Sequence, residues 1–265
     1  MTRIAKSIAI FGGNGFLGRK ICEIGVKLGY NVIAFSRSGP AASIKAPWVD
    51  QVQWKKGNIF EPETYKHQLE GVDAVVHSIG TLFEDTSYKE SLNTSITSNS
   101  IQKLGNLFTK GNPMEKSEHK TYGAIQRDSA VLLADTFLQT KGKSHSYVYI
   151  SADQALPFIP EYSATKREAE QLLSQKERLR TIIMRPGFMY DEKEPNPLNA
   201  RNLLRFFLTA GYDVKSCLLG NRMELANKLV RPPVSTAEVA SKIFEILEDS
   251  NFRGKVTLEE IRNKH

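Results

Sequence analysis

The sequence contains few cysteines, no long apolar run and no basic tract of the kind that binds nucleic acids. Its two cysteines, Cys22 and Cys217, exclude a disulfide framework, and their spacing is not that of a metal site. No stretch approaches the roughly 18 consecutive apolar residues that a membrane-spanning helix needs. Arginines are not interleaved with aromatic residues, so we expect no nucleic-acid partner. Cys22 falls in the apolar pattern of a predicted helix, where we expect a small buried side chain.

We expect no secretory signal peptide in the first residues, because a predicted strand already begins at Ser7. A long cleavable transit peptide is likewise not expected. Residues 1–22 carry basic side chains and no acidic one, which is a weak indication of targeting to an organelle. The whole chain has a net charge of +7, which suits anionic cofactors, anionic lipid surfaces and the mitochondrial matrix.

Short apolar runs alternate with helical patterns over most of the chain. The expected strands cover 7–12, 30–38, 52–60, 73–80, 145–153 and 180–187, and the expected helices cover 16–29, 62–71, 127–139 and 162–175. Asp128 is the expected N-cap of the third helix. This alternation predicts a doubly wound α/β fold of the Rossmann type, with a parallel sheet covered on both faces. We expect residues 1–265 to form a single domain of this kind.

Two segments interrupt the alternation. Residues 81–121 are polar and rich in Ser, Thr and Asn, and long irregular insertions of this kind are usually functional or disordered. Residues 187–233 combine apolar and basic side chains, and we expect them to form a small cap on the substrate side. One interpretation of that cap is a small helical unit with a solvated basic face. The other is a functional segment, which forms a lid over an apolar substrate or a patch that rests on anionic lipid.

A glycine-rich turn follows the first predicted strand and opens the first predicted helix. In "SIAIFGGNGFLGRK", Gly12 allows a tight turn, Gly15 lets the backbone approach a pyrophosphate, and Gly18 lets helix and strand pack closely. The helix N-terminus offers N–H groups and a partial positive charge to phosphates. The turn therefore predicts a dinucleotide site, with further contacts from Gly13, Asn14, Phe16 and Leu17.

The end of the second predicted strand indicates which dinucleotide is bound. An NAD site usually carries an acidic residue here for the ribose hydroxyls, but this chain has Ser36, Arg37 and Ser38. An arginine pairs well with a 2′-phosphate, and the flanking hydroxyls add hydrogen bonds. NADP(H) is therefore favoured over NAD(H), and the alternative is that Arg37 points to solvent.

Further cofactor contacts are expected where other strands end, because ligands bind beyond the carboxyl ends of parallel strands. They are Asn58 and Ile59 near the adenine, Ser78, Ile79 and Gly80 near the ribose, and Arg185, Pro186 and Gly187 near the nicotinamide. His77 and His145 look like packing or surface histidines, and no metal site is predicted.

A possible proton relay follows the fifth predicted strand. Tyr162 and Lys166 are four residues apart, on one face of a helix, and Ser151 ends the preceding strand. A neighbouring ammonium favours the phenolate form of a tyrosine, which then exchanges a proton with a substrate oxygen as hydride moves. Ser151 is expected to hydrogen-bond the same oxygen. A Tyr and a Lys at this spacing also occur by chance in many helices.

Taken in order, "GGNGFLG", Ser151, "YSATK" and "RPG" resemble the short-chain dehydrogenase/reductase superfamily. More narrowly, the chain resembles an atypical mitochondrial branch that includes the nucleotide-binding accessory subunit of respiratory complex I. Within it, the similarity is greatest to fungal reductase-like proteins of coenzyme Q (ubiquinone) biosynthesis. That narrower resemblance lies in "FGGNGFLGRKIC", "VVHSIG", "YISAD", "KREAE", "RPGFMYDE", "LVRPPVST" and "KVTLEEI".

The resemblance implies a mitochondrial oxidoreductase at the matrix face of the inner membrane. It implies a hydrophobic, quinone-like substrate and partners among the proteins of coenzyme Q synthesis, with peripheral contact to the membrane. In this family, Lys166 also binds the ribose. The sequence departs from the commonest members in ending its fourth strand with "SIG" rather than "NAG". A non-catalytic nucleotide-binding scaffold and an NAD-dependent epimerase or dehydratase therefore stay open as alternatives.

Overall fold

The computed structural model describes residues 5–39, 46–80, 121–142, 145–153, 160–192 and 231–263. Cys217 lies outside the described residues, as do almost all of the predicted insertion and most of the predicted cap. The expectations about those two segments, and about a single domain over the whole chain, therefore stay predictions.

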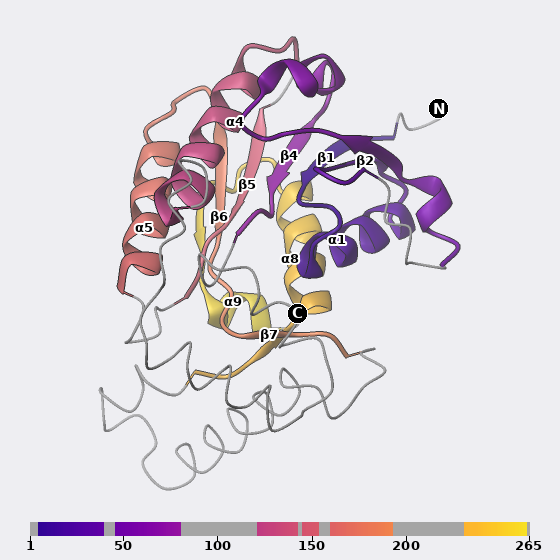
Figure 1. The fold of residues 1–265 in the computed structure, drawn as a ribbon. Coiled ribbons are helices and arrows are strands. Elements are labelled where there is room, and N and C mark those ends of the chain that lie inside the picture. The colour runs from indigo at the N-terminus through magenta and orange to yellow at the C-terminus, as the bar shows by residue number, and fades with distance from the viewer. Residues whose placement is uncertain are drawn as a thin grey trace, which may run out of the picture.

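The described residues form a seven-stranded sheet in which every neighbouring pair is parallel (Figure 1). In spatial order the strands are β3 (Gln53–Lys56), β2 (Asn31–Ser36), β1 (Ser7–Phe11), β4 (Ala74–His77), β5 (Ser146–Ile150), β6 (Arg180–Met184) and β9 (Gly254–Val256). The chain order reverses between β1 and β4, which is the switch point where such sheets bind ligands. The predicted doubly wound α/β fold is confirmed.

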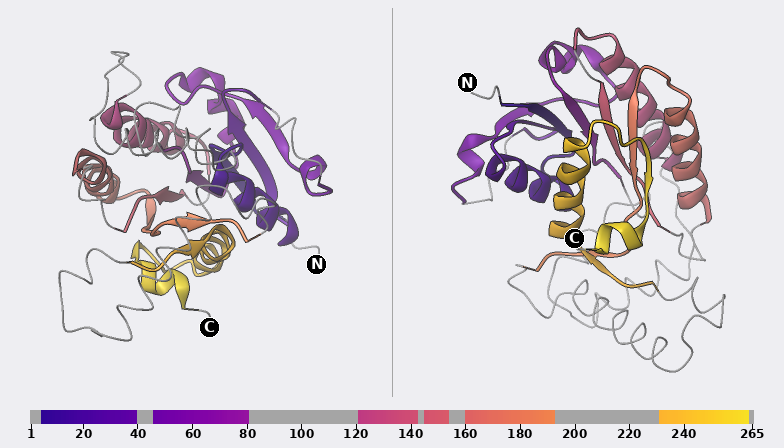
Figure 2. Two further views of the ribbon diagram at one scale, coloured as in Figure 1. Left: turned by 60° about the horizontal axis from the view of Figure 1, so that its bottom comes forward. Right: turned by 180° about the vertical axis from the view of Figure 1, so that it is seen from behind.

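Two helical layers cover the sheet (Figure 2). On one face lie α1 (Phe16–Lys27) and α8 (Thr236–Glu248), and on the other lie α4 (Ser129–Leu138) and α5 (Pro160–Ser174). Alternate residues of β1 serve the two layers, since Ile8 and Ile10 pack toward α1 and α8, while Ala9 and Phe11 pack toward α4 and α5. Both layers are apolar, as expected for a parallel sheet that is buried on both faces.

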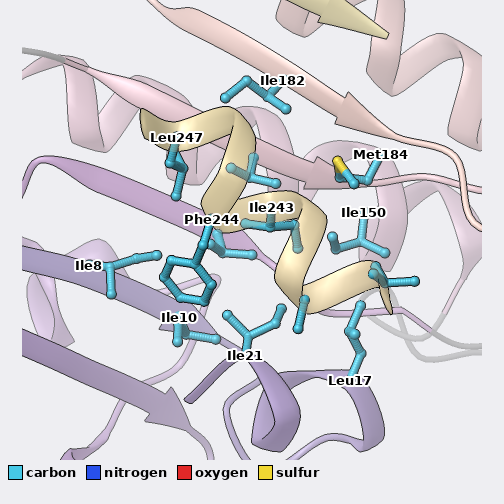
Figure 3. Packing of buried hydrophobic residues seen from close by; sticks show 14 of the residues in the cluster. Ile8, Ile10, Leu17, Ile21, Ile150, Ile182, Met184, Ile243, Phe244 and Leu247 are labelled. Carbon is cyan, nitrogen blue, oxygen red and sulfur yellow. The ribbon is translucent and has the colours of Figure 1, made fainter. Parts of the chain in front are cut away.

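The contact between α1 and α8 depends on Gly25. A Cβ atom at this position would lie 2.9 Å from Cζ of Phe244 and 3.0 Å from Cγ2 of Val32. Figure 3 shows Phe244 and Ile243 of α8 directed toward the strands, beside Ile21 of α1. The glycine lets the Phe244 ring fill this space, so that α8 closes the core over the first strands.

Two local predictions are wrong. Asp128 has helical backbone angles and does not cap α4; its carboxylate accepts a hydrogen bond from Nε of Arg127 at 2.7 Å. A π-helical segment (Gly123–Asp128) precedes α4 directly, and there the Tyr149 hydroxyl donates to the Gln126 carbonyl oxygen at 2.8 Å. The helix predicted over 62–71 is instead two short 3₁₀ turns, Pro62–Thr64 and Lys66–Leu69.

From the sequence, no strand or helix is predicted for residues 234–262, where the structure has several elements. Besides α8 and β9, they comprise α9 (Leu258–Arg262) and β8 (Val234–Ser235), which pairs in parallel with β7 (Met189–Tyr190). Side chains cap both helices, since Ser235 and Thr257 each form a capping box with the glutamate three residues on.

Cys22 and His77 are both buried. Burial raises the pKa of the Cys22 thiol to about 12, as fits a small core side chain. Burial, together with the nearby Lys166, lowers the pKa of His77 to about 3, so this histidine is neutral. Its Nε2 lies 2.8 Å from Oγ of Ser129.

Within the described ranges, no helix is both long and apolar enough to cross a bilayer, and no side chains group as metal ligands.

Arg180, at the start of β6, holds the C-terminal end of α8 against the sheet. Its guanidinium donates hydrogen bonds to the carbonyl oxygens of Ile246 at 2.7 Å, Asp249 at 2.5 Å and Phe252 at 2.9 Å. Carbonyls at the end of a helix have no partner within the helix, so this one side chain replaces a conventional cap.

Replacing Arg180 with Met should therefore leave these carbonyls without their donor. We expect the free energy of unfolding to fall by about 2 kcal/mol or more, because partly buried acceptors lose hydrogen bonds to a charged group. Arg178→Met is the matched control, since Arg178 is exposed two residues earlier. Urea unfolding of both variants measures the effect, and equal stabilities would contradict the capping role of Arg180.

Candidate functional site

The glycine turn connects β1 to α1 at the switch point of the sheet. Gly12 has a φ of +89°, and a Cβ atom there would lie 2.8 Å from the carbonyl oxygen of Ser78. The N–H groups of Gly12 and Gly13 both donate to the carbonyl oxygen of Phe35, at 3.0 and 3.1 Å. The turn is therefore fixed to the ends of both strands that neighbour β1.

The N-terminus of α1 is open to an anion. Gly15 precedes the helix in an extended conformation, no side chain caps the helix, and its first turn contains no acidic residue. A Cβ atom at Gly18 would lie only 2.1 Å from the carbonyl oxygen of Gly12, so only glycine fits there. With the positive end of the helix dipole, this arrangement fits a pyrophosphate group.

Asn14 joins the glycine turn to the loop that follows β2. Its Nδ2 donates to Oγ of Ser36 at 3.0 Å, to Oγ of Ser38 at 3.1 Å and to the carbonyl oxygen of Gly39 at 2.7 Å. The hydroxyls of Ser36 and Ser38 are therefore already engaged within the loop. Arg37 is exposed between them and forms no ion pair with any residue that the structure describes.

Two buried polar atoms at this turn have no hydrogen-bond partner among the described residues. They are Oδ1 of Asn14, an acceptor, and Nε of Arg19, a donor one helical turn into α1. Buried polar atoms of proteins are nearly always paired. A phosphate oxygen of a dinucleotide would supply the acceptor that Nε of Arg19 lacks, and this donor therefore fits such a cofactor at the turn.

Past β3, the predicted adenine contacts are only partly available. The Asn58 side chain is used locally, since its Nδ2 donates to the Glu61 carboxylate at 2.7 Å and its Oδ1 accepts from the Phe60 N–H at 3.3 Å. Ile59 is 6% exposed and packs into the core on the α4 and α5 side. Both lie at the predicted edge of the sheet, but Ile59 presents little surface to a ligand.

The segment after β4 meets Lys166 of α5. A Cβ atom at Gly80 would lie 3.7 Å from Nζ of Lys166, and one at Gly12 would lie 3.3 Å from the Ile79 side chain. The N–H of Ser78 donates to the carbonyl oxygen of Phe11 at 2.9 Å. The structure thus brings Lys166, from α5, to the same edge as the glycine turn.

Lys166 is 3% exposed. Its Nζ donates to the carbonyl oxygen of Ile150 at 2.7 Å and lies 4.8 Å from the centre of the Tyr149 ring. Burial lowers its pKa to about 7, against the opposing attraction of Glu170. A buried amine whose pKa lies near neutrality is typical of functional sites.

Tyr162 lies one helical turn before Lys166 on α5. Its half-buried ring packs edge-to-face against the ring of Tyr122, with 6.0 Å between ring centres. Tyr122 immediately precedes the π-helical segment, so the aromatic pair joins α5 to the start of the α4 helix. The predicted pair of Tyr162 and Lys166 is thus found on one helix at the carboxyl edge of the sheet.

Ser151 is used differently from the prediction. It is 4% exposed, and its hydroxyl donates to Oε1 of Glu170 at 2.5 Å. The guanidinium groups of Arg185 and Arg167 also bind the Glu170 carboxylate. Burial opposes ionisation of Glu170, but hydrogen bonds from Arg185 and Ser151 hold its pKa below the usual range. Ser151 and Arg185 are thus joined in a buried ionic network.

Glu170 is the residue of this region that the sequence reasoning missed. It follows Lys166 by four residues, so the helical period that pairs Tyr162 with Lys166 also places Glu170 on their face of α5. Arg167 extends the network by donating to the carbonyl oxygens of Ala152 at 2.9 Å and Asp153 at 2.6 Å. The Arg167 guanidinium therefore fixes the loop after β5 through hydrogen bonds to its backbone.

Pro186 and Gly187, which follow β6, lie against the loop after β5 and against α9. The Pro186 carbonyl oxygen accepts from the Asp153 N–H at 2.9 Å, and a Cβ atom at Gly187 would lie 3.1 Å from the Leu258 side chain. Asp153 also binds Nε of Arg231 at 2.5 Å, so the loop after β5 meets the segment that leads into β8. Pro186 and Gly187 follow β6 as predicted, and they contact Asp153 and Leu258 respectively.

Gly18→Ala should disrupt the phosphate cradle, because the new methyl group overlaps the Gly12 carbonyl. We expect NADPH affinity to fall at least tenfold. Gly25→Ala, on the same helix, is the control, since its methyl group meets the side chains of Phe244 and Val32 and lies away from the glycine turn. It should lose some stability and keep its affinity. Isothermal titration of both variants measures the difference, and retained NADPH affinity in Gly18→Ala would contradict the cradle.

Stability should depend on pH through Lys166. Its folded-state pKa of about 7 lies below the ordinary 10.5, so between these values the unfolded chain binds more protons. Stability therefore rises with pH across this window and is lost as the pH falls toward 7. Relative to Lys166→Met, the wild type should gain up to about 1.4 kcal/mol per pH unit. Urea unfolding at pH 7, 8.5 and 10 tests this, and a constant difference would contradict it.

Comparisons with known proteins agree with this geometry. The family model described as Male sterility protein, an NAD-binding family, matches residues 56–225. The chain is 40% identical to MIOREX complex component 2 of Saccharomyces cerevisiae over 271 residues, covering 96% of this chain and 98% of that protein. It is 27% identical to 2-alkyl-3-oxoalkanoate reductase of Stenotrophomonas maltophilia over 191 residues, which covers 69% of this chain and 51% of the reductase.

Among solved structures, a short-chain dehydrogenase from Streptomyces avermitilis shares the fold. Its TM-score is 0.57 at 18% identity, over 97% of this chain and 88% of that one. The glycine turn, the parallel sheet and the matched family model all indicate a dinucleotide-binding protein. The chain belongs to the NAD-binding family described as Male sterility protein.

Proposed function

We propose that this chain is an NADP(H)-dependent oxidoreductase of mitochondrial coenzyme Q biosynthesis that acts on a hydrophobic, quinone-like intermediate. The observation that carries the proposal is the convergence, at one edge of the sheet, of an uncapped α1 N-terminus with a buried Lys166. The first fits the phosphates of a dinucleotide, and the second lies beside Gly80, where the ribose is expected.

The preference for NADP(H) rests on the loop after β2. It carries the exposed Arg37 and no acidic residue, whereas an acid at this position would repel a 2′-phosphate. Arg37 has no ion-pair partner among the described residues, so its planar guanidinium is available for a phosphate. The alternative of an NAD-dependent epimerase or dehydratase is disfavoured by the same residue.

When bound, the nicotinamide ring supplies or accepts the hydride. Lys166 would bind the ribose hydroxyls through Nζ, which already faces the chain at Gly80. The Tyr162 hydroxyl would give a proton to, or take one from, the substrate oxygen. The Ser151 hydroxyl donates its hydrogen bond to Glu170, so the proton transfer would depend on Tyr162 and Lys166. The 27% identical reductase, named for 3-oxoalkanoates, supports carbonyl reduction as the reaction class.

The cellular setting is proposed from similarity. The resemblance to mitochondrial reductase-like proteins of coenzyme Q synthesis supports a place at the matrix face of the inner membrane. The 40% identity to a component of the MIOREX complex supports assembly with other proteins. The net charge of +7 favours peripheral contact with an anionic membrane surface. Most of the cap, 193–230, lies outside the described residues, and its role over the substrate stays a prediction.

A second function is favoured by one observation. Because the Ser151 hydroxyl donates to Glu170, Ser151 does not offer a free donor to a substrate oxygen. A nucleotide-binding protein that regulates or scaffolds the quinone-synthesis complex, without turnover, would need only the cradle and Arg37. The two functions differ in whether the Tyr162 hydroxyl is required.

Nucleotide binding should appear as a gain in stability. At a concentration of 100 times its dissociation constant, NADPH should raise the free energy of unfolding by about 2.7 kcal/mol. NADH at the same concentration should raise it less, because it has no 2′-phosphate for Arg37. Mass spectrometry of nucleotide released from the purified protein provides an independent measurement. Stabilisation by neither nucleotide would contradict the proposal, and stabilisation by NADH alone would contradict the role of Arg37.

Turnover is tested by Tyr162→Phe, which removes the hydroxyl and keeps the ring that packs on Tyr122. If the protein is an enzyme, cells that carry only Tyr162→Phe should make less coenzyme Q, although NADPH still binds. Gly18→Ala is the comparison, since it should weaken NADPH binding itself at least tenfold. Normal quinone levels with Tyr162→Phe, and low levels with Gly18→Ala, would favour the scaffold over the oxidoreductase.

A further inference from the structure

We propose that Lys56, on the edge strand β3, is a second specificity residue, which with Arg37 binds a phosphate ester on the adenosine ribose. The inference rests on the proposed binding of NADP(H). It adds a residue that the motifs of the sequence do not mark, because Lys56 belongs to a different strand from the glycine turn and from Arg37.

The backbone places Lys56 directly beside the loop that carries Arg37. In the parallel pairing of β2 and β3, Lys56 is the register partner of Ser36. The next N–H, of Gly57, donates to the Ser36 carbonyl oxygen at 3.0 Å. At the other end of the loop, a Cβ atom on Gly39 would lie 3.8 Å from Cβ of Lys56. The Lys56 side chain thus starts in contact with the loop.

Strand alternation puts Lys56 on the α1 side of the sheet. Trp54, two residues earlier, packs against the core cluster on the α1 and α8 side, and residues two apart on a strand share a face. The register partner Ser36 binds Asn14 of the glycine turn. Lys56 and Asn14 therefore meet the same loop after β2, where the 2′ position of the ribose is expected.

Lys55 has the opposite placement. Its register partner is Phe35, which packs into the core cluster on the α4 and α5 side of the sheet. The two lysines are therefore adjacent in sequence, both exposed, and directed to opposite sides. They form a matched pair in which the charge and the strand are the same and only the side of the sheet differs.

The charge around the loop is unbalanced. Arg37 and Lys56 are both exposed, and neither forms an ion pair with any residue that the structure describes. No acidic residue occurs in 36–39 or 53–58, and the next one, Glu61, is hydrogen-bonded to Asn58. A phosphate monoester, with a charge near −2, would be bound by both cations. Arginine supplies a planar fork and lysine a mobile point charge.

The test compares Lys56→Met with Lys55→Met in the full-length protein, by isothermal titration with NADPH, NADH, 2′,5′-ADP and 3′,5′-ADP. Lys56→Met should weaken NADPH and 2′,5′-ADP about fivefold, as expected for one partly exposed ion pair, and leave NADH unchanged. Lys55→Met should bind all four like the wild type. Urea unfolding without ligand checks that both variants fold.

Several outcomes would overturn the inference. An equal loss of NADPH and NADH affinity in Lys56→Met would place the lysine away from the 2′-phosphate. An equal effect in Lys55→Met would mean that only the general charge of the surface matters. A preference for 3′,5′-ADP would indicate a different phosphoadenosine ligand. If the wild-type protein binds no dinucleotide at all, the proposed function fails instead, so the two failures are distinguishable.

Discussion

The carbonyl oxygen of Gly12 is closely surrounded by the glycine turn, and the first half of the site depends on it. The N–H of Gly15 donates to it at 2.8 Å, and Gly18 faces it without room for a single methyl group. On the other side, the Gly12 Cα packs against the end of β4 at Ser78. The start of α1 is thus held over the point where the strand order reverses.

The second half of the site, around Lys166 and Ser151, is held in place by buried ion pairs and hydrogen bonds and not by close backbone packing. Glu170 is buried under α5, where two arginines and the Ser151 hydroxyl satisfy its carboxylate. Removing one partner of such a network leaves a buried charge uncompensated, so the network fixes α5 against the ends of β5 and β6. Lys166 is placed by this helix. The two halves therefore depend on different interactions, since buried ion pairs hold one and close backbone packing holds the other.

The sequence predicted what depends on local periodicity. Buried strands such as 73–80 and the helix over 16–29 were found because their apolar patterns repeat with a clear period. Asp128 was misassigned because the preceding turns are π-helical and are held by Tyr149, which is distant in sequence. No local pattern distinguishes a cap from such a tertiary contact.

At the site, the sequence located the glycine turn and the pair of Tyr162 and Lys166 by motif and spacing. It did not predict that Ser151 would bind Glu170, because hydrogen-bond partners depend on how α5 packs against β5. It did not mark Lys56, because strand register sets which residue lies beside Ser36. Both omissions concern contacts between elements, which periodicity alone does not determine.

The position of α8 in the chain has a consequence for how the protein is made. This helix covers the apolar face built by Ile8 and Ile10 of the first strand, yet it comes from residues 236–248 (Figure 3). During synthesis from the N-terminus, α1 can cover part of that face early, but the part under α8 stays uncovered until residues 236–248 have been made. The apolar core on this side of the sheet can therefore close only after α8 has been synthesised.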